Sequence, residues 1–344
     1  MFMGEESHLS HVRSWLRGWT VTAPINWRVM EIEDPSAPYI TGTFQRVLVY
    51  RAPLHFANDI GDALVVYCST APKGLLLLKL MLLGRRSPKD VLALFHNQLA
   101  RLLPFSVFNE LNLMFSLPQP RALTFLVLGE SIREAVTQLV RFRPGGLGAI
   151  DQPSLLATRA LDVAQQSSGL RFGFLGVSLN KGFDEFILLA RRLRASGASV
   201  RYSMVGTINH PANVVWFQDV LPDASSTPIT AEEYQRRAEA LTYVVWTAAP
   251  RDYDLRASAT FVDAMCFGKP GIYLRNRYVE HYFHRFGDIG YLCDDVESMY
   301  GVMKEVSDRF PRERYLEQTR NIAVARGCFS PERVGGQLRN ILTT

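Results

Sequence analysis

The sequence lacks a hydrophobic run long enough to cross a lipid bilayer. The longest candidate covers residues 75–83, and Lys79 interrupts it. The first ten residues are polar and acidic, so we expect no secretory signal. The modest net charge of +5 would by itself suit an anionic ligand, an anionic membrane surface or no particular partner. The four scattered cysteines are what predict a reducing, cytoplasmic environment.

Cysteine is scarce, which argues against a disulfide-stabilised or zinc-stabilised fold. The chain has four cysteines, and their positions lack metal-site or disulfide spacing. An arginine-rich stripe interleaved with aromatic residues is also missing, as is any nucleic-acid motif, so we expect no nucleic-acid partner. What is present is typical of globular proteins: 47% hydrophobic and 21% charged residues over 344 positions, enough for two domains.

Short β-rich apolar runs alternate with longer helical patterns along most of the chain. The predicted strands are residues 20–23, 63–68, 91–95, 123–128, 171–175, 200–205, 214–217, 243–246, 271–274 and 291–293. The predicted helices are residues 74–83, 131–141, 181–195, 231–240, 259–267 and 296–310. This alternation indicates an α/β protein with parallel sheets and crossover helices.

Turn formers between residues 145 and 170 predict a domain junction. We therefore expect an N-terminal domain over 1–155, a C-terminal domain over 156–325 and a last helix over 326–344. Residues 7–16 already have a helical pattern, which leaves only 1–4 for the strand that should precede it. The first strand is thus expected to be very short or missing.

The segment 172–183 is the first with chemical content. An apolar strand ends at Gly176, a polar turn follows, and a helix begins near Lys181. Free N–H groups and the dipole at a helix start favour a phosphate, and a lysine adds a point charge. An ordinary strand-to-helix turn with a solvated lysine is the alternative, because single glycine turns are common.

The segment 253–270 places a second helix start after a polar loop. Ser258 is a suitable N-cap, and Gly268 with Pro270 ends the helix. A phosphate could lie at this start with Arg256 as a fork-shaped donor, and Asp263 could accept hydrogen bonds from a ribose diol. Alternatively, Arg256 and Asp263 form a local surface pair.

In this order and separation, the two segments resemble the donor domain of GT-B glycosyltransferases, especially the bacterial family 4 (group 1) enzymes. The similar residues are Phe174-Leu175-Gly176 with Lys181-Gly182, the run from Asp263 to Pro270, the loop and strand from Gly287 to Leu292, and Phe329-Ser330 before a helix. The resemblance covers about residues 170–344. The first half fits in its strand–helix rhythm and in Phe95-His96-Asn97.

The chain departs from the family pattern at three places. Val177 stands where the family has an arginine, and the loop to Lys181 is one residue shorter. Leu255 stands at the first of two family glutamates, with Asp254 beside it, and the second glutamate is Asp263.

The resemblance implies two Rossmann-like α/β/α domains facing across a cleft, with the C-terminal helix crossing back to the N-terminal domain. It implies retaining sugar transfer from a nucleotide-diphosphate sugar, UDP- or GDP-linked, to a saccharide or lipid-linked acceptor in surface polysaccharide assembly. The donor diphosphate would contact Gly176, Lys181, Arg256 and Ser258, and the ribose or sugar would contact Asp263 and Asp254. No cofactor and no metal are expected, because Lys181 and the helix starts can carry the diphosphate charge.

In the first half, His96 follows the strand 91–95 and is our candidate catalytic residue. Ligands of open α/β sheets bind beyond the carboxyl ends of strands, where a histidine can position or deprotonate an acceptor hydroxyl. A lone histidine can also be structural. Glu130 follows the next strand, and we expect it to be a first-turn acid favoured by the helix dipole.

The stretch from Lys73 to Arg86 is apolar and basic. We expect a buried crossover helix, because the run is apolar on nearly all sides. The alternative is peripheral contact with an anionic membrane, where a lipid-linked acceptor would reside; residues 15–19 carry the same ambiguity.

Two other functions compete with sugar transfer. One is a nucleotide-sugar epimerase on the same fold, for which we find no further acid/base residues. The other is a non-catalytic, nucleotide-sugar-binding scaffold derived from a glycosyltransferase, which Val177 and Leu255 favour.

Overall fold

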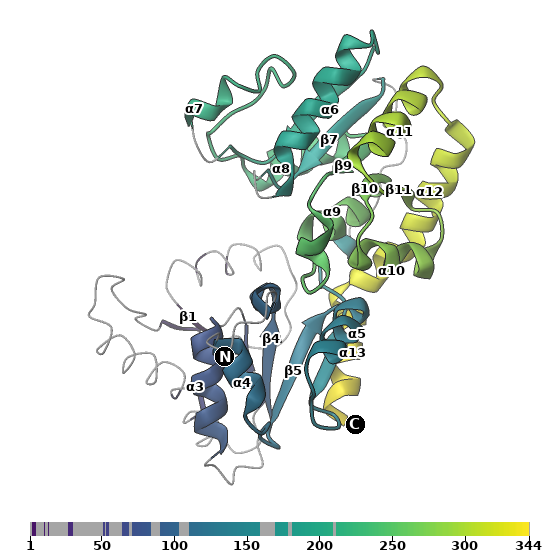
Figure 1. Cartoon of the computed structure of the whole chain (residues 1–344). Helices are drawn as coiled ribbons and strands as arrows, with labels where there is room; N and C mark the ends of the chain where they lie inside the picture. Colours follow the sequence, from purple (N-terminus) through teal and green to yellow (C-terminus); the bar gives the residue numbers. More distant parts are fainter. Residues whose placement is uncertain are drawn as a thin grey trace. The chain divides into compact units, whose positions relative to one another are not determined.

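The computed structural model describes residues 2–4, 10, 13, 27–29, 51, 53–54, 64–68, 71–83, 90–102, 110–158, 169–177, 181–208 and 211–343. The chain forms two compact units (Figure 1). One contains Met1–Leu126 and Val140–Gly148, and the other contains Val127–Leu139 and Ala149–Thr344. The predicted domain limits at 155 and 325 remain predictions.

A four-stranded sheet in the order β3-β4-β5-β6 organises the first half of the chain. Its strands are β3 (Val65–Tyr67), β4 (Val91–Phe95), β5 (Leu123–Leu128) and β6 (Leu147–Ile150). Its helical segments are α3 (Pro72–Leu83), η1 (Gln98–Leu102), α4 (Glu110–Ser116) and α5 (Glu130–Leu139). Strands β3 and β4 are parallel, and β4 and β5 are buried along most of their length, which explains their almost wholly apolar sequences.

The start of the chain forms a short strand, as its few available residues predicted. Strand β1 (Phe2–Gly4) pairs in parallel with β2 (Trp27–Val29). The predicted helix 7–16 is described only at residues 10 and 13, and both are helical. The predicted strand 20–23 and residues 15–19 lie outside the described residues.

Helix α3 buries one face against α4, in agreement with a crossover helix. Lys79 lies on that buried face, with 2% of its surface exposed, and its ammonium donates to the carbonyls of Met114 (2.5 Å) and Leu117 (2.8 Å). These carbonyls are at the end of α4, where no backbone N–H can pair with them. The sequence did not reveal that Lys79 would be buried and bonded in this way.

The second unit contains a five-stranded sheet in the order β11-β10-β9-β7-β8, and all its pairings are parallel. The strands are β7 (Arg171–Leu175), β8 (Arg201–Val205), β9 (Tyr243–Trp246), β10 (Gly271–Leu274) and β11 (Gly290–Cys293). The helices from residue 183 on are α6 (Phe183–Ala195), α7 (Pro211–Val214), α8 (Ala231–Glu239), α9 (Ala259–Cys266), α10 (Arg277–Phe286), α11 (Val296–Asp308), α12 (Arg312–Ala325) and α13 (Pro331–Thr343). Short 3₁₀ turns are η2 (Leu155–Thr158), η4 (Pro250–Tyr253) and η5 (Arg326–Phe329).

One predicted strand is wrong. Residues 214–217 end the short helix α7 and continue into turns, and no strand forms there. Val215 and Trp216 are 73% and 71% exposed, so this apolar run has no sheet to join. Strand β6 was missed, because its short sequence lies among the turn formers that predicted a junction.

Candidate functional site

The second sheet has a topological switch point between β7 and β9. The chain leaves β7 for β8 on one side and then places β9 on the other side of β7. In open α/β sheets, ligands bind beyond the carboxyl ends of the strands at this point. Here those ends lead into Gly176 and Thr247.

Gly176 and Lys181 lie together at the end of β7. Gly176 has a φ of 64° and donates its N–H to the carbonyl of Val205 at 2.9 Å. A Cβ at Gly176 would lie 3.4 Å from the Lys181 ammonium and 3.1 Å from the hydroxyl of Thr260 on α9. The lysine therefore extends back over the glycine, and both face the start of α9.

The start of α6 is fixed against the end of β9. Gly182 has a φ of 81°, and any side chain there would clash with the carbonyl of Thr247. The Thr247 hydroxyl donates to the carbonyl of Gly182. This contact sets the position of Lys181, the residue before Gly182, at the switch point.

Helix α9 begins at the predicted cap. The Ser258 hydroxyl accepts a hydrogen bond from the N–H of Phe261 at 3.1 Å, and Ser258 is buried. Two residues earlier, the Arg256 guanidinium stacks 4.5 Å from the centre of the Tyr253 ring. This stacking holds a cation beside the helix start without pairing it with a carboxylate.

Asp263 lies on the same helix and receives a hydrogen bond from an unpredicted partner. The Tyr234 hydroxyl on α8 donates to Asp263 Oδ2 at 2.9 Å. The alternative of a local Arg256–Asp263 surface pair has no counterpart among the described ion pairs. Tyr234 carried one signal in the sequence: with Ala238 and Leu241 it forms an apolar face at helical spacing.

The charges of Lys181, Arg256 and Asp263 act on one another. Burial lowers the pKa of Lys181, nearby Arg256 lowers it further, and Asp263 opposes both. Burial raises the pKa of Asp263 to about 6, against the lowering effects of Tyr234 and Lys181. Two cations and one carboxylate at a helix start leave a net positive site, which suits a ligand with several negative charges.

The remaining C-terminal candidates lie around the loop before α9. Burial raises the pKa of Asp254, and the nearby Arg277 and Arg251 oppose that rise. Asp254 therefore has other charged neighbours than Asp263, which interacts with Lys181. Asp252 and Asp254 have the Asp-x-Asp spacing that can hold a metal ion. The described residues, however, include no group of three His, Cys, Asp or Glu side chains placed to hold one. Leu255 is 3% exposed and belongs to the core.

The N-terminal candidates follow β4 and β5. His96 is exposed in the turn after β4, and the buried Gln98 side chain accepts the N–H groups of His96 (2.7 Å) and Asn97 (3.1 Å). Gln98 thus shapes this turn, which the sequence did not reveal. Glu130 pairs with Arg133 one turn along α5, as expected for a first-turn acid. The catalytic role of His96 remains a prediction.

Comparison with known proteins finds similarity at the level of the fold. No protein-family model and no curated protein sequence matches the chain. Among solved structures, the lipopolysaccharide outer core galactosyltransferase WaaB aligns over 99% of this chain and 98% of its own, with a TM-score of 0.64 and 11% identity. Sucrose-phosphate synthase from Thermosynechococcus elongatus aligns over 92% and 82%, with a TM-score of 0.65 and 11% identity.

A third similar structure was solved with ligands. It is a TarM mutant from S. aureus in complex with Fondaparinux, alpha-GlcNAc-glycerol and UDP, with a TM-score of 0.60 and 14% identity. The alignment covers 86% of this chain and 59% of TarM, so the chain spans about three fifths of that relative.

The two parallel sheets and these neighbours define a GT-B fold with two Rossmann-like domains, as the resemblance implied. Within the part of the chain that the structure describes, no helix is long and apolar enough to span a membrane.

Proposed function

We propose that the chain transfers a sugar from a nucleotide-diphosphate sugar to a hydroxyl acceptor. The observation that carries the proposal is the group of Lys181, Arg256 and Asp263 at the switch point of the second sheet. The similar structures are glycosyltransferases or bind UDP, which supports the same chemistry. A UDP- or GDP-sugar is the expected donor.

In this proposal the diphosphate lies between the two helix starts. Lys181 and Arg256 bind its oxygens, Gly176 leaves space for close backbone approach, and the N–H groups that begin at Ser258 add donors. Asp263 accepts the ribose hydroxyls, and Asp254 contacts the sugar. No metal is needed, since two cations and a helix dipole neutralise the departing diphosphate.

The chemical step is the departure of the diphosphate from an oxocarbenium-like centre. Electrostatic stabilisation of that leaving group is the main catalytic task, and here it falls to Lys181 and Arg256. His96 positions or deprotonates the acceptor. Retention of configuration follows from the family resemblance.

The test is a thermal-shift screen with UDP, GDP, ADP, dTDP and CMP, with and without magnesium. A ligand of the native state raises the unfolding temperature as its concentration exceeds the dissociation constant. We expect one diphosphate to give a shift without metal, and Lys181→Ala to abolish that shift. Lys304→Ala is the matched control, because Lys304 forms an exposed pair with Asp308 on α11. The absence of any shift with wild type would remove the donor site.

The buried Leu255 favours a second candidate, a non-catalytic nucleotide-sugar-binding protein, because the family places an acid there. Donor binding without transfer to any acceptor would support this candidate. Turnover of a nucleotide sugar without any acceptor would instead indicate an epimerase.

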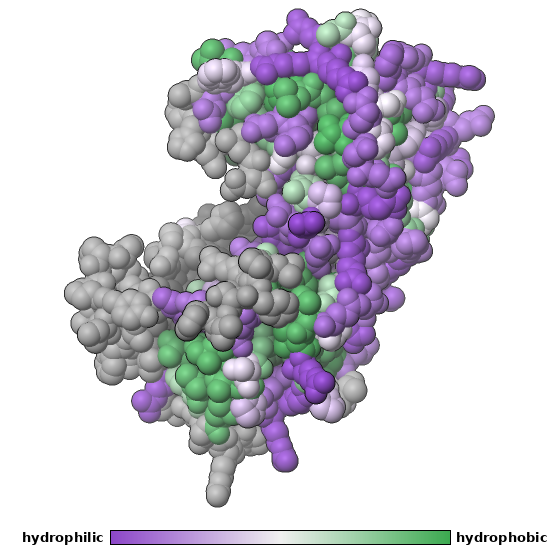
Figure 2. All heavy atoms as spheres, in the orientation of Figure 1, coloured by the Kyte–Doolittle hydropathy of each residue, from purple (hydrophilic) through white to green (hydrophobic). Residues whose placement is uncertain are grey.

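We further propose a cytoplasmic location with peripheral contact at the inner face of an anionic membrane. Hydrophobic residues gather over α3 and α4 on the face shown in Figure 2. Leu80 and Leu83 on α3 and Leu113 on α4 are exposed. An acceptor linked to a lipid would be reached from this surface. Failure to sediment with anionic vesicles, together with failure to use a lipid-linked sugar, would remove this part of the proposal.

A further inference from the structure

Tyr234 joins the hydrophobic core of the second unit to the candidate site. Its ring packs against the buried cluster that contains Leu175, Ala264 and Phe267, while its hydroxyl points to Asp263 Oδ2. Burial raises the pKa of Tyr234 well above its usual value, so the hydroxyl stays protonated at neutral pH. It is therefore a permanent hydrogen-bond donor to this carboxylate.

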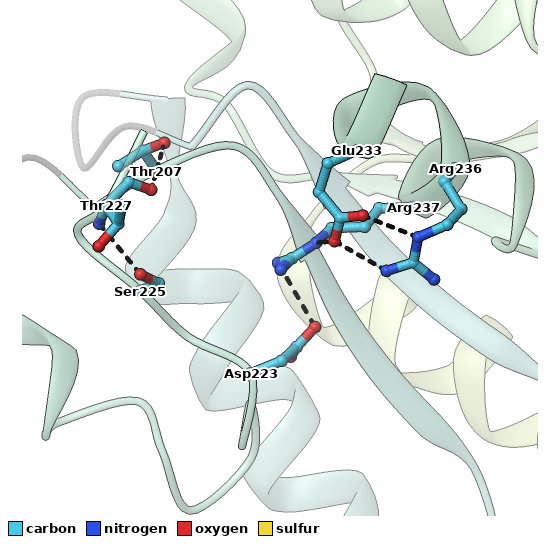
Figure 3. A network of polar contacts seen from close by, with 7 residues as sticks. All are labelled: Thr207, Asp223, Ser225, Thr227, Glu233, Arg236 and Arg237. Atoms are coloured by element: carbon cyan, nitrogen blue, oxygen red, sulfur yellow. Dashed lines mark hydrogen bonds and ion pairs between the residues drawn. The ribbon is translucent and has the colours of Figure 1, made fainter. Parts of the chain in front are cut away.

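Helix α8, which carries Tyr234, is itself held by a polar network (Figure 3). Thr230 caps the helix by accepting from the N–H of Glu233 at 3.2 Å. The Glu233 carboxylate binds both Arg236 and Arg237, and Arg237 lies 3.5 Å from Asp223 in the preceding loop.

The same loop is shaped by small hydroxyl side chains. Thr227 donates its N–H to the Ser225 hydroxyl at 3.0 Å, and its carbonyl lies 3.5 Å from the Thr207 hydroxyl (Figure 3). Thr207 follows β8 closely, and Asp223, Ser225 and Thr227 lie in one loop before α8, so two separate groups of polar contacts shape the segment between β8 and α8. Tyr234 lies on α8 one residue after Glu233, which the second group binds.

We propose that Tyr234 is a positioning residue for the donor: its hydroxyl holds Asp263 Oδ2, so that the carboxylate presents its remaining acceptor sites to the ribose diol. This inference rests on the proposed function. A carboxylate offers about four lone-pair directions, so one bond from tyrosine leaves enough acceptors for two hydroxyls.

Among the described residues, three titratable groups face Asp263. They are Tyr234 from α8, Lys181 from the turn before α6, and Cys266 one turn further along α9. In the proposed complex the Lys181 ammonium binds the diphosphate, so its charge is shared between the diphosphate and Asp263. Cys266 is buried, and burial raises the pKa of its thiol to about 11, so it carries no charge at neutral pH. Tyr234 is then the partner that keeps its bond to the carboxylate when the donor is bound.

The experiment measures the affinity of a nucleotide sugar, UDP-glucose or GDP-mannose, by calorimetry from pH 5 to 8. The intact sugar is used because a terminal phosphate would titrate near pH 6 itself. Wild-type affinity should fall as the pH drops through about 6, where Asp263 becomes protonated. In Tyr234→Phe the carboxylate loses a hydrogen bond that stabilises its charged form, so its pKa rises. The pH at which the affinity falls should therefore move upward by roughly half to one unit.

Matched variants separate positioning from general damage. Tyr315→Phe also removes a buried tyrosine hydroxyl, which donates to Thr242 at 3.3 Å, and should leave the pH midpoint unchanged. Asp263→Asn should abolish the pH step, and Tyr234→Phe should then have no further effect on it. If Tyr234→Phe unfolds, Tyr234→Leu replaces it and should give the same upward shift.

The outcomes distinguish the two proposals. A folded Tyr234→Phe or Tyr234→Leu protein with the wild-type midpoint would overturn the positioning role and leave the donor site intact. A wild type that binds neither nucleotide sugar at any pH would overturn the donor site and the role of Tyr234 together.

Discussion

At the scale of single residues, the Asp263 carboxyl couples the stability of the fold to pH. Its pKa is about 6 in the folded chain and about 4 in an unfolded one. The folded state therefore binds this proton more tightly, and the resulting stability is complete below about pH 4 and lost as the pH rises through about 6.

We accordingly expect wild type to lose roughly 2–3 kcal/mol between pH 4 and 7 relative to Asp263→Asn, which has no proton to release there. Urea unfolding of both proteins at several pH values measures the difference. Parallel pH profiles would show that Asp263 titrates normally.

Gly176 supports a second prediction at this scale. A φ of 64° disfavours any other residue, and a Cβ would press on the Thr260 hydroxyl and come into contact with the Lys181 ammonium. We expect Gly176→Ala to destabilise the protein by about 1 kcal/mol and to weaken nucleotide binding. Gly301→Ala is the control: Gly301 lies in α11 with open space around it, and alanine should stabilise the helix there. Equal effects of both variants on thermal unfolding and nucleotide affinity would contradict the prediction.

The sequence predicted those site residues whose role depends on a neighbour close along the chain. The glycine turn at Gly176 and the cap at Ser258 are local signals, and the structure shows both. The contacts of Tyr234 with Asp263 and of Thr247 with Gly182 join residues 29 and 65 positions apart. Such pairs depend on which helix packs over which strand, and no local pattern specifies that.

At the scale of elements, helix α3 shows how burial changes the chemistry of a charged residue. Desolvation lowers the pKa of Lys79 to about 8, from about 10 in an unfolded chain. Between these values the unfolded chain binds more protons, so stability rises as the pH rises. We expect a gain on the order of 1 kcal/mol between pH 8 and 10 in wild type, and none in Lys79→Met.

Denaturant unfolding across that pH range tests the prediction. Lys73→Met is the control, because Lys73 lies on the same helix but is half exposed and pairs loosely with Glu110 at 3.7 Å. It should keep the wild-type slope. A rise of the same size in Lys79→Met would mean that other groups cause it.

Elements were predictable where burial repeats along the chain. Strands β4, β5, β7, β9 and β10 have the predicted limits, since each is an apolar run buried in a parallel sheet. The run 214–217 has the same composition but is mostly exposed, so composition alone misassigned it. Helix α10 was not predicted, although its buried residues Tyr278, Val279 and Tyr282 have helical spacing.

At the scale of the molecule, Asp151 joins distant parts of the chain. It follows β6 directly, is buried, and accepts hydrogen bonds from Tyr282 (2.9 Å), Arg285 (3.1 Å) and Gln337 (2.8 Å). Gln337 lies on α13 and also accepts the Asp151 N–H at 2.8 Å. The last helix is thus bonded to the residue that follows β6, and both partners belong to the second unit. No sequence signal marked Asp151 as a partner of α13.

Removing this carboxylate should therefore cost more than removing a typical surface acid. Asp151→Ala leaves a buried tyrosine hydroxyl and an arginine without their acceptor, and we expect a loss of about 2–4 kcal/mol in urea unfolding. Asp151→Asn keeps one acceptor oxygen and should lose less. Glu130→Ala is the matched control, since its pair with Arg133 is exposed and such pairs contribute roughly 0–1 kcal/mol. If Asp151→Ala and Glu130→Ala lose the same amount, the bonds between α10, α13 and the end of β6 do not stabilise the fold, and the aromatic contacts of Tyr282 with Phe261 and Phe329 must carry that packing instead.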